Sequence, residues 1–219
     1  MTYRVNGTCV PISFMVMGPI ENNVYIVHDD GGCFVVDPTA HADRILEAVG
    51  DRKLDAIVIT HGHWDHTGAA AELREKTGAP VIASAEDTPF ITGEGGEERH
   101  RRLNTPCVVD RTVADGDVLE IGFMKWQVIA TPGHTPGGVC YFLEPSEGQK
   151  GAPVLLSGDT LFAGTHGRTD FPESNPADMK KSLKRLAELP GETIVLPGHN
   201  NFTTIAREHS WLVRGGLYR

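Results

Sequence analysis

Residues 61–66 of this 219-residue chain read His-Gly-His-Trp-Asp-His. The stretch holds four side chains that bind metal ions, namely His61, His63, Asp65 and His66. Imidazole and carboxylate ligands together suit a borderline divalent cation such as zinc, manganese or iron. An ordinary solvated turn has no need of three imidazoles and a carboxylate at this spacing. The stretch therefore predicts a metal site.

The segments on either side of this stretch would hold it in place. Before it, residues 56–59 read Ala-Ile-Val-Ile, an apolar run that predicts a short buried strand. After it, residues 68–73 read Gly-Ala-Ala-Ala-Glu-Leu, the start of a small-residue helix that we expect to end at Gly78. A strand would thus deliver the four candidate ligands, and the start of a helix would fix them.

Three further apolar runs end in the same way. Residues 126–129 lead into Thr-Pro-Gly-His134, residues 154–156 into Ser-Gly-Asp159, and residues 193–196 into Pro-Gly-His199. Glycine directly precedes the candidate ligand in each of these endings, where the backbone must turn sharply. Because ligands collect beyond the carboxyl ends of strands in layered α/β proteins, we expect these side chains to join the first four.

The complete set of candidate ligands has seven members: His61, His63, Asp65, His66, His134, Asp159 and His199. Seven are too many for one tetrahedral zinc ion, which takes four protein ligands or three and a water. They suit two metal ions that share a carboxylate and a bridging water or hydroxide. Two ions about 3.5–4 Å apart can generate a nucleophile and stabilise the oxyanion that it creates.

The HxHxDH stretch, followed in order by His134, Asp159 and His199, resembles the metallo-β-lactamase superfamily over nearly the whole chain. The resemblance implies one αββα domain over residues 1–219, with two facing sheets, helices outside and the metals at one edge. It assigns the ligands of a first metal, His61, His63 and His134, and those of a second, Asp65, His66 and His199. Asp159 would bridge the two, and Asp65 would also orient the attacking hydroxide. Zinc is the expected metal, with iron or manganese as alternatives.

Two stretches narrow the resemblance. Residues 158–162, Gly-Asp-Thr-Leu-Phe, and 167–171, Gly-Arg-Thr-Asp-Phe, are similar to the glyoxalase II (hydroxyacylglutathione hydrolase) branch and to the related persulfide dioxygenases. β-Lactamases generally carry Cys where this chain has Asp159, so lactam hydrolysis is not expected. The glyoxalase II resemblance implies hydrolysis of a small acyl thioester such as S-lactoylglutathione. It makes Arg168 a candidate contact for glutathione, with a surface salt bridge as the equal alternative.

His166 lies between Asp159 and Arg168 and is a second candidate for substrate binding, although a partly exposed loop residue is the favoured interpretation. Full-length glyoxalase II also has a C-terminal helical domain that supplies much of its glutathione clamp. Here only residues 200–219 follow the last ligand. A compact bacterial glyoxalase II-like hydrolase, acting on lactoylglutathione or another small thioester, fits better.

The main alternative is a persulfide dioxygenase, in which one iron would be held by residues matching His61, His134 and Asp159. The full set of seven favours the two-metal hydrolase. A non-catalytic module on the same fold is disfavoured because such members usually lose ligands. A nuclease is disfavoured by the net charge of −9, from 20 Lys and Arg against 29 Asp and Glu, because phosphate binding needs clustered cations.

The rest of the chain predicts a cytoplasmic enzyme with a small-molecule substrate and no membrane or nucleic-acid partner; its oligomeric state is left open. No apolar run approaches the roughly 20 residues of a membrane span. The four cysteines form no CxxC pair and read as buried, reduced thiols. Residues 90–106 predict a surface loop or lid. Asp37, at the end of an early strand, reads as a turn carboxylate in preference to a group that supports the site.

Overall fold

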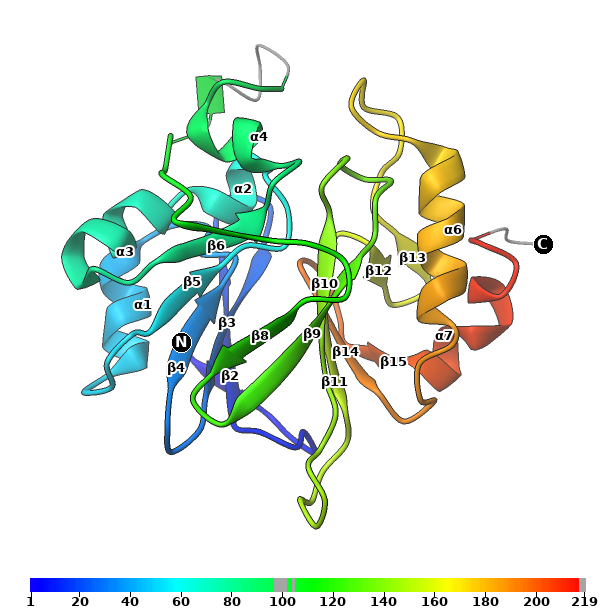
Figure 1. Ribbon diagram of the computed structural model, residues 1–219, viewed down its shortest axis with the longest axis horizontal. Helices are drawn as coiled ribbons and strands as arrows, with labels where there is room; N and C mark the ends of the chain where they lie inside the picture. Colours follow the sequence, from blue (N-terminus) through cyan, green and yellow to red (C-terminus); the bar gives the residue numbers. More distant parts are fainter. Residues whose placement is uncertain (97–101, 104, 217–219) are drawn as a thin grey trace.

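The computed structural model describes residues 1–96, 102–103 and 105–216 of the chain. Its first sheet has seven strands in sequential order, antiparallel from β1 to β4 and parallel from β4 to β7 (Figure 1). These strands are β1 (Tyr3–Val5), β2 (Ile12–Met17), β3 (Asn22–His28), β4 (Cys33–Val36), β5 (Ala56–Val58), β6 (Val81–Ser84) and β7 (Arg111–Val113).

The second sheet has six strands in the order β15-β14-β11-β10-β9-β8, and only the β11–β14 pair is parallel within the part of the chain described. Its strands are β8 (Val118–Ile121), β9 (Met124–Ala130), β10 (Val139–Leu143), β11 (Val154–Gly158), β14 (Ile194–Pro197) and β15 (Thr203–Thr204). A separate two-stranded ribbon pairs β12 (Leu161–Phe162) with β13 (Thr165–His166).

Helices α1 (Ala42–Val49) and α3 (Ala70–Thr77) cover the outer face of the first sheet, and α6 (Pro176–Leu186) and α7 (Ile205–Leu212) cover that of the second (Figure 1). Two shorter helices in the described ranges, α2 (Trp64–Thr67) and α4 (Thr88–Thr92), lie at the edge of the first sheet. One apolar cluster joins α1 and α3 to the first sheet, and another joins α6 and α7 to the second. The predicted αββα architecture is confirmed.

The largest core lies between the two sheets. Phe34 of the first sheet meets Trp126 of the second edge to face, with ring centres 5.6 Å apart, and both side chains are buried. Full burial of one such side chain contributes about 1.5–3 kcal/mol. The burial of successive side chains depends on what covers each strand. Strands β4, β5 and β6 are buried at every residue because both of their faces are covered, whereas β8 alternates exposed and buried residues.

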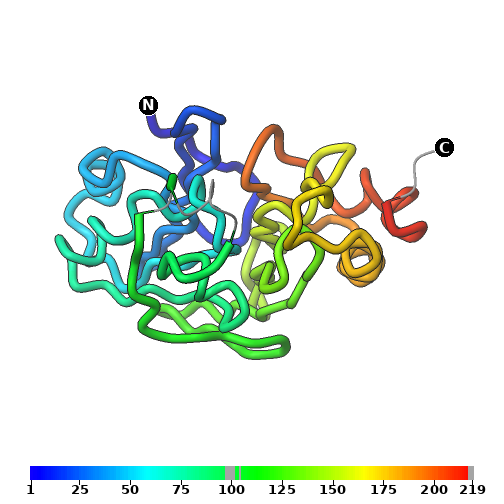
Figure 2. Tube along the Cα trace, turned by 90° about the horizontal axis from the view of Figure 1, so that it is seen from above, coloured from blue at the N-terminus to red at the C-terminus, as the bar shows by residue number. Residues whose placement is uncertain are grey.

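The two halves of the chain lie side by side, with the N-terminus in one and the C-terminal helices in the other (Figure 2). Backbone hydrogen bonds join the halves at one edge. Val139 N donates to Thr60 O at 2.9 Å, and Asn23 N donates to Gly198 O at 2.7 Å. The segments that follow β5, β9, β11 and β14 meet at this edge, which brings the predicted ligands together.

Two features of the sequence prediction need correction. The surface loop predicted over residues 90–106 starts inside α4, where Phe90 and Ile91 are buried. Residues 97–101 and 104 of that range lie outside the described residues, so the lid remains a prediction. The short strands β1, β7, β12 and β13 were not predicted.

Candidate metal centre

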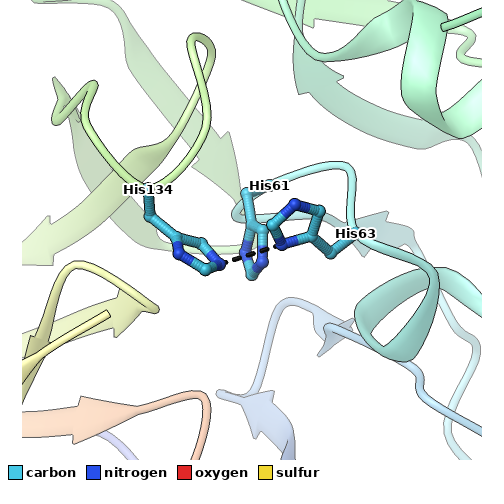
Figure 3. A group of neighbouring side chains, drawn as sticks. All are labelled: His61, His63 and His134. Carbon is cyan, nitrogen blue, oxygen red and sulfur yellow. Dashed lines mark hydrogen bonds between the residues drawn. The ribbon is translucent and has the colours of Figure 1, made fainter. Parts of the chain in front are cut away.

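Three imidazoles converge from two loops (Figure 3). His61 and His63 follow β5, and His134 follows β9. His63 Nδ1 lies 2.9 Å from His134 Nε2, and one nitrogen from each of the three rings lies within 4.8 Å of the others. All three side chains are buried. This arrangement matches the set of ligands predicted for a first metal.

Asp65, His66 and His199 form a second group beside the first. Asp65 Oδ2 lies 3.2 Å from His66 Nε2 and 3.3 Å from His199 Nε2, and the two imidazole nitrogens are 3.3 Å apart. Ligands at about 2.0–2.1 Å from one tetrahedral ion would be separated by about 3.3 Å. Three atoms of this group therefore already have the spacing of one face of such a site.

Asp159 lies between the two groups. Its Oδ2 is 3.5 Å from His134 Nε2 in the first group and 3.5 Å from His199 Nε2 in the second. Its Oδ1 is 3.4 Å from His66 Nε2. The structure thus brings together all seven residues that the sequence singled out, with one carboxylate placed to contact both metal positions.

Each of the five imidazoles has one ring nitrogen beside an oxygen outside the cluster. The contacts are His61 Nδ1 with Thr60 Oγ1 at 3.1 Å, His63 Nε2 with Glu173 Oε1 at 3.1 Å, His66 Nδ1 with Asp37 Oδ2 at 2.9 Å, His134 Nδ1 with Arg168 O at 2.7 Å, and His199 Nδ1 with Ile20 O at 3.1 Å. A metal-binding histidine typically donates its second N–H in this way, which leaves the other nitrogen as an acceptor. By this pattern, the nitrogens that would bind the metal ions are Nδ1 of His63 and Nε2 of the other four rings.

The residues fit a pair of borderline cations. His61 Nε2 and Asp159 Oδ1 are buried and have no hydrogen-bond partner among the described residues. Buried polar atoms normally have partners, and unpaired ones mark functional sites or places where an ion binds. Five imidazoles with two carboxylates form a donor set that suits zinc or iron.

The pKa values of the ligand side chains differ between the two groups. Burial, together with the neighbouring imidazoles, lowers the pKa of His61 well below its usual value, and burial lowers the pKa of His134 to about 4. Burial opposes ionisation of Asp65, but the charge of His66 and hydrogen bonds from His199, His66 and Asn22 outweigh it and hold the pKa of that carboxyl well below its usual range. Neutral imidazoles and ionised carboxylates are the forms that bind metals, so His61, His134 and Asp65 already have them. In the second group, burial opposes protonation of His66 and His199, but the nearby carboxylates outweigh it and raise the pKa of both imidazoles, and a bound cation would take the place of their protons.

Asp37 supports the centre, so its interpretation as a turn carboxylate is wrong. The residue has a positive φ of 49° at the end of β4 and is 2% exposed. Its Oδ1 accepts a hydrogen bond from Thr60 N at 2.8 Å, and its Oδ2 accepts one from Thr60 Oγ1 at 2.6 Å in addition to the contact with His66. A single aspartate after a strand gave too little signal to predict this role.

Two other carboxylates were missed. Glu173 contacts His63, and it stands in a loop without a metal-binding motif. Asp87 accepts hydrogen bonds from Gly62 N at 2.8 Å, Thr135 Oγ1 at 2.7 Å and Gly137 N at 2.7 Å. It thereby joins the loop of His61 and His63 to that of His134.

The glycines before the ligands have two different roles. Gly158 has φ 47°, so the backbone there does turn into the left-handed region, as expected. At Gly198 the requirement is space, because a Cβ would lie 2.4 Å from Asp159 Oδ1 and 2.6 Å from His66 Cε1. The expectation of a sharp turn does not explain this position.

A cleft of about 570 Å³ opens beside the cluster. Phe171 forms part of its wall, with its ring centre 5.5 Å from that of His63. Arg168 and His166 also line the cleft. The Arg168 guanidinium pairs with Asp170 at 2.8 and 2.9 Å and lies 4.4 Å from the centre of the Phe171 ring. Arg168 therefore both lines the cleft and makes the salt bridge that was its alternative role.

None of the helices in the described ranges is long and apolar enough to cross a membrane. The four cysteines are free and buried, as predicted.

Comparison with known proteins identifies relatives. Residues 17–199 match the family described as the Metallo-beta-lactamase superfamily. The chain is 31% identical over 197 residues to "Hydroxyacylglutathione hydrolase GloC" of Haemophilus influenzae, covering 86% of this chain and 89% of that protein. It is 37% identical over 183 residues to "Hydroxyacylglutathione hydrolase" of Ectopseudomonas mendocina, covering 82% of this chain and 62% of that one.

Solved structures agree with the sequence matches. TTHA1623, crystallised "in a di-iron-bound form", is 35% identical with a TM-score of 0.77, over 89% of this chain and 96% of that one. ETHE1 from Myxococcus xanthus is 29% identical with a TM-score of 0.75, over 93% of this chain and 84% of that one.

Proposed function

Since the chain belongs to the metallo-β-lactamase superfamily and is a metal-dependent hydrolase with a His/Asp metal site, we propose that it hydrolyses small acyl thioesters with two bound metal ions. The observation that carries the proposal is the position of Asp159, within 3.5 Å of a ligand nitrogen in each group. One carboxylate shared between two complete groups is the arrangement that a dinuclear hydrolase requires.

The residues of the centre would have separate roles in the reaction. His61, His63 and His134 would hold one ion, and Asp65, His66 and His199 the other, with Asp159 between them. When bound, such ions lower the pKa of water and polarise a carbonyl oxygen. Asp65, ionised and fixed by its hydrogen bonds, would also accept a hydrogen bond from the attacking water and orient it. A thiolate is a good leaving group, so the reaction needs no strong acid in the cleft.

The lining of the cleft supports a substrate with one apolar part and one polar part. Phe162 and Phe171 lie near the ligands, with ring centres 6.1 Å from His199 and 5.5 Å from His63. Such walls keep bulk water away from the reacting carbonyl. His166 and Arg168 line the same cleft, and we propose that they contact the thiol half of the substrate.

The relatives support a thioester of the glutathione type without fixing the acyl group. The chain covers 89% of the compact hydroxyacylglutathione hydrolase GloC and 62% of the longer hydrolase of E. mendocina. The pairing of Arg168 with Asp170 means that a glutathione carboxylate would have to compete for that guanidinium. We therefore propose S-lactoylglutathione or a smaller acyl thioester as substrate, and zinc as the metal, with iron or manganese as alternatives.

The second candidate is a persulfide dioxygenase with one iron. The stretch of residues 167–171 favours it, because Gly-Arg-Thr-Asp-Phe is similar to the persulfide dioxygenases as well as to the glyoxalase II branch. The complete second group of Asp65, His66 and His199, with its ligand-like spacing, favours the two-metal hydrolase instead.

The test is turnover of a panel of acyl thioesters by the metal-loaded protein and by Asp159→Ala. The variant should fold, bind less metal and lose more than about 100-fold in turnover, beyond the usual effect of losing an outer partner of a ligand. Asp43→Ala, at an exposed helix position, is the matched control and should match the native protein. A fully active, fully metallated Asp159→Ala would contradict the two-metal proposal. Oxygen consumption with glutathione persulfide, and no thioester hydrolysis, would favour the dioxygenase.

A further inference from the structure

Asn22, the first residue of β3, contacts all three members of the second metal group. Its Nδ2 donates to Asp65 Oδ2 at 2.8 Å and lies 3.2 Å from His66 Nε2 and 3.3 Å from His199 Nε2. The side chain is fully buried. These are the same three atoms that face the position of the second metal, so one amide touches each ligand atom of that group.

The contact with Asp65 decides which way its carboxylate faces. Asp65 Oδ2 is the oxygen that lies 3.2 and 3.3 Å from the two imidazole nitrogens. A carboxylate can rotate, whereas His66 and His199 are fixed by hydrogen bonds from their Nδ1 atoms to Asp37 and to Ile20 O. Of the three ligands, the carboxylate is therefore the one that most needs a partner to stay in place. Asn22 supplies that partner through its hydrogen bond to Asp65 Oδ2.

The pairing of the Asn22 amide shows where its main role lies. Its Oδ1 is buried and has no hydrogen-bond partner among the residues that the structure describes. A buried asparagine that served only to tie backbone segments together would pair its oxygen as well. Asn22 instead directs its nitrogen to the ligand atoms and leaves its oxygen unpaired, which is a pattern found at functional sites.

The next residue provides a contrast within the same strand. Asn23 is also buried, and its Nδ2 donates to Pro197 O at 3.0 Å and to Asn200 O at 3.0 Å. It holds the backbone of the loop that carries His199, and within the described part of the chain these hydrogen bonds reach backbone carbonyls and no ligand side chain. Asn23 thus supports the loop, whereas its neighbour Asn22 supports the ligand side chains.

We propose that Asn22 is a positioning residue for the second metal, and that its hydrogen bond to Asp65 sets the affinity of that position and hence the choice between one and two bound ions. The inference rests on the proposed function, because it presupposes a two-metal centre. It concerns the second group alone, because the hydrogen bonds and close contacts of the Asn22 side chain reach Asp65, His66 and His199.

The test is metal binding by the full chain, with no need of turnover. The protein is stripped with a chelator and titrated with Co²⁺ and with Zn²⁺ against a competing chelator, and the stoichiometry is read by elemental analysis. Native protein should bind two ions. Asn22→Ala should weaken the second ion by about 10- to 100-fold, the usual effect of losing an outer partner, and leave the first within about threefold. Asn23→Ala should bind both ions like the native protein.

Asn22→Leu keeps the volume of the side chain and removes its donor, so it carries the same test if the alanine variant fails to fold. It too should lose the second ion selectively, with a changed visible spectrum of the second Co²⁺. The proposal is overturned if the variants bind two ions as the native chain does, if both ions weaken equally, or if Asn23→Ala has the same effect. Native protein that binds fewer than two ions would overturn the proposed function itself, and the role of Asn22 with it.

Discussion

Asp37 Oδ2 accepts a hydrogen bond from His66 Nδ1 at 2.9 Å, and through this carboxylate the end of β4 supports both metal groups. The same oxygen accepts from Thr60 Oγ1 at 2.6 Å, and that hydroxyl lies 3.1 Å from His61 Nδ1. His66 belongs to the second group and His61 to the first. One buried aspartate therefore fixes a ligand on each side of the centre.

Asp37→Asn should weaken binding of both ions by about tenfold or more each, the effect expected from loss of an outer partner. The Asp37 carboxylate accepts hydrogen bonds from Thr60 and from His66. The amide of asparagine has only one acceptor oxygen, and its NH₂ group would face one of these donors, so either Thr60 or His66 loses its acceptor. Metal titration of stripped protein measures both affinities. Asp43→Asn, on the exposed face of α1, serves as control. Native-like affinities in Asp37→Asn would refute this role.

Glu173→Ala should weaken the first ion by about 10- to 100-fold and leave the second nearly unchanged. The reason is that Glu173 Oε1 lies 3.1 Å from His63 Nε2 and orients that ring toward His134. Glu173→Gln keeps an acceptor oxygen and should lose less. Glu188→Ala, at an exposed position, is the matched control. Selective loss of the second ion in Glu173→Ala would show that the assignment of the two groups is wrong.

Gly198→Ala should impair the centre although it removes no ligand. Its Cβ would lie 2.4 Å from Asp159 Oδ1 and 2.6 Å from His66 Cε1, so one of these ligands must move. We expect turnover and metal content both to fall by about tenfold or more, since outer-shell disturbances have effects of that size. Gly191→Ala is the control, because its Cβ would lie 3.4 Å from Ala206 Cβ, and its stability should stay within about 0.5 kcal/mol. Equal turnover and metal content in Gly198→Ala and Gly191→Ala would contradict the close packing of Gly198 against Asp159 and His66.

The cysteines should be inert in the folded protein. Burial raises the pKa of the Cys33, Cys107 and Cys140 thiols from 9.0 to about 11. Because the neutral form is favoured in the fold, their contribution to stability is complete below the unfolded pKa and is lost as pH rises from about 9 toward about 11. A thiol reagent at about pH 8 should modify almost none of the four before unfolding and all four afterwards. Rapid modification of native protein at that pH would contradict their burial.

The sequence predicted the ligands well because each follows an apolar strand directly, and the carboxyl ends of such strands meet at one edge. It predicted their supporting partners poorly, because these contacts join residues that are distant in the chain. Asn22 and Asp65 are 43 residues apart, and His63 and Glu173 are 110 apart. Neither Asn22 nor Glu173 belongs to a motif, so only the fold reveals its role.

The same contrast holds for the architecture. The apolar strands that precede the ligands were predicted to within a few residues, because runs of consecutive apolar residues are typical of strands buried in a sheet. The ribbon of β12 and β13 was missed, because each strand has only two residues and no periodic pattern can form. This ribbon separates Asp159 from Arg168 and places His166 at the cleft.

The central claim is that two complete ligand groups share Asp159, and the most direct test is the metal content of protein purified without chelator or added metal, followed by incubation with zinc and with iron. We expect close to two ions per chain, as zinc, iron, manganese or a mixture. A single iron that cannot be supplemented would contradict the dinuclear centre and favour a mononuclear oxygenase. Negligible metal after both incubations would show that the seven side chains do not form a metal site at all.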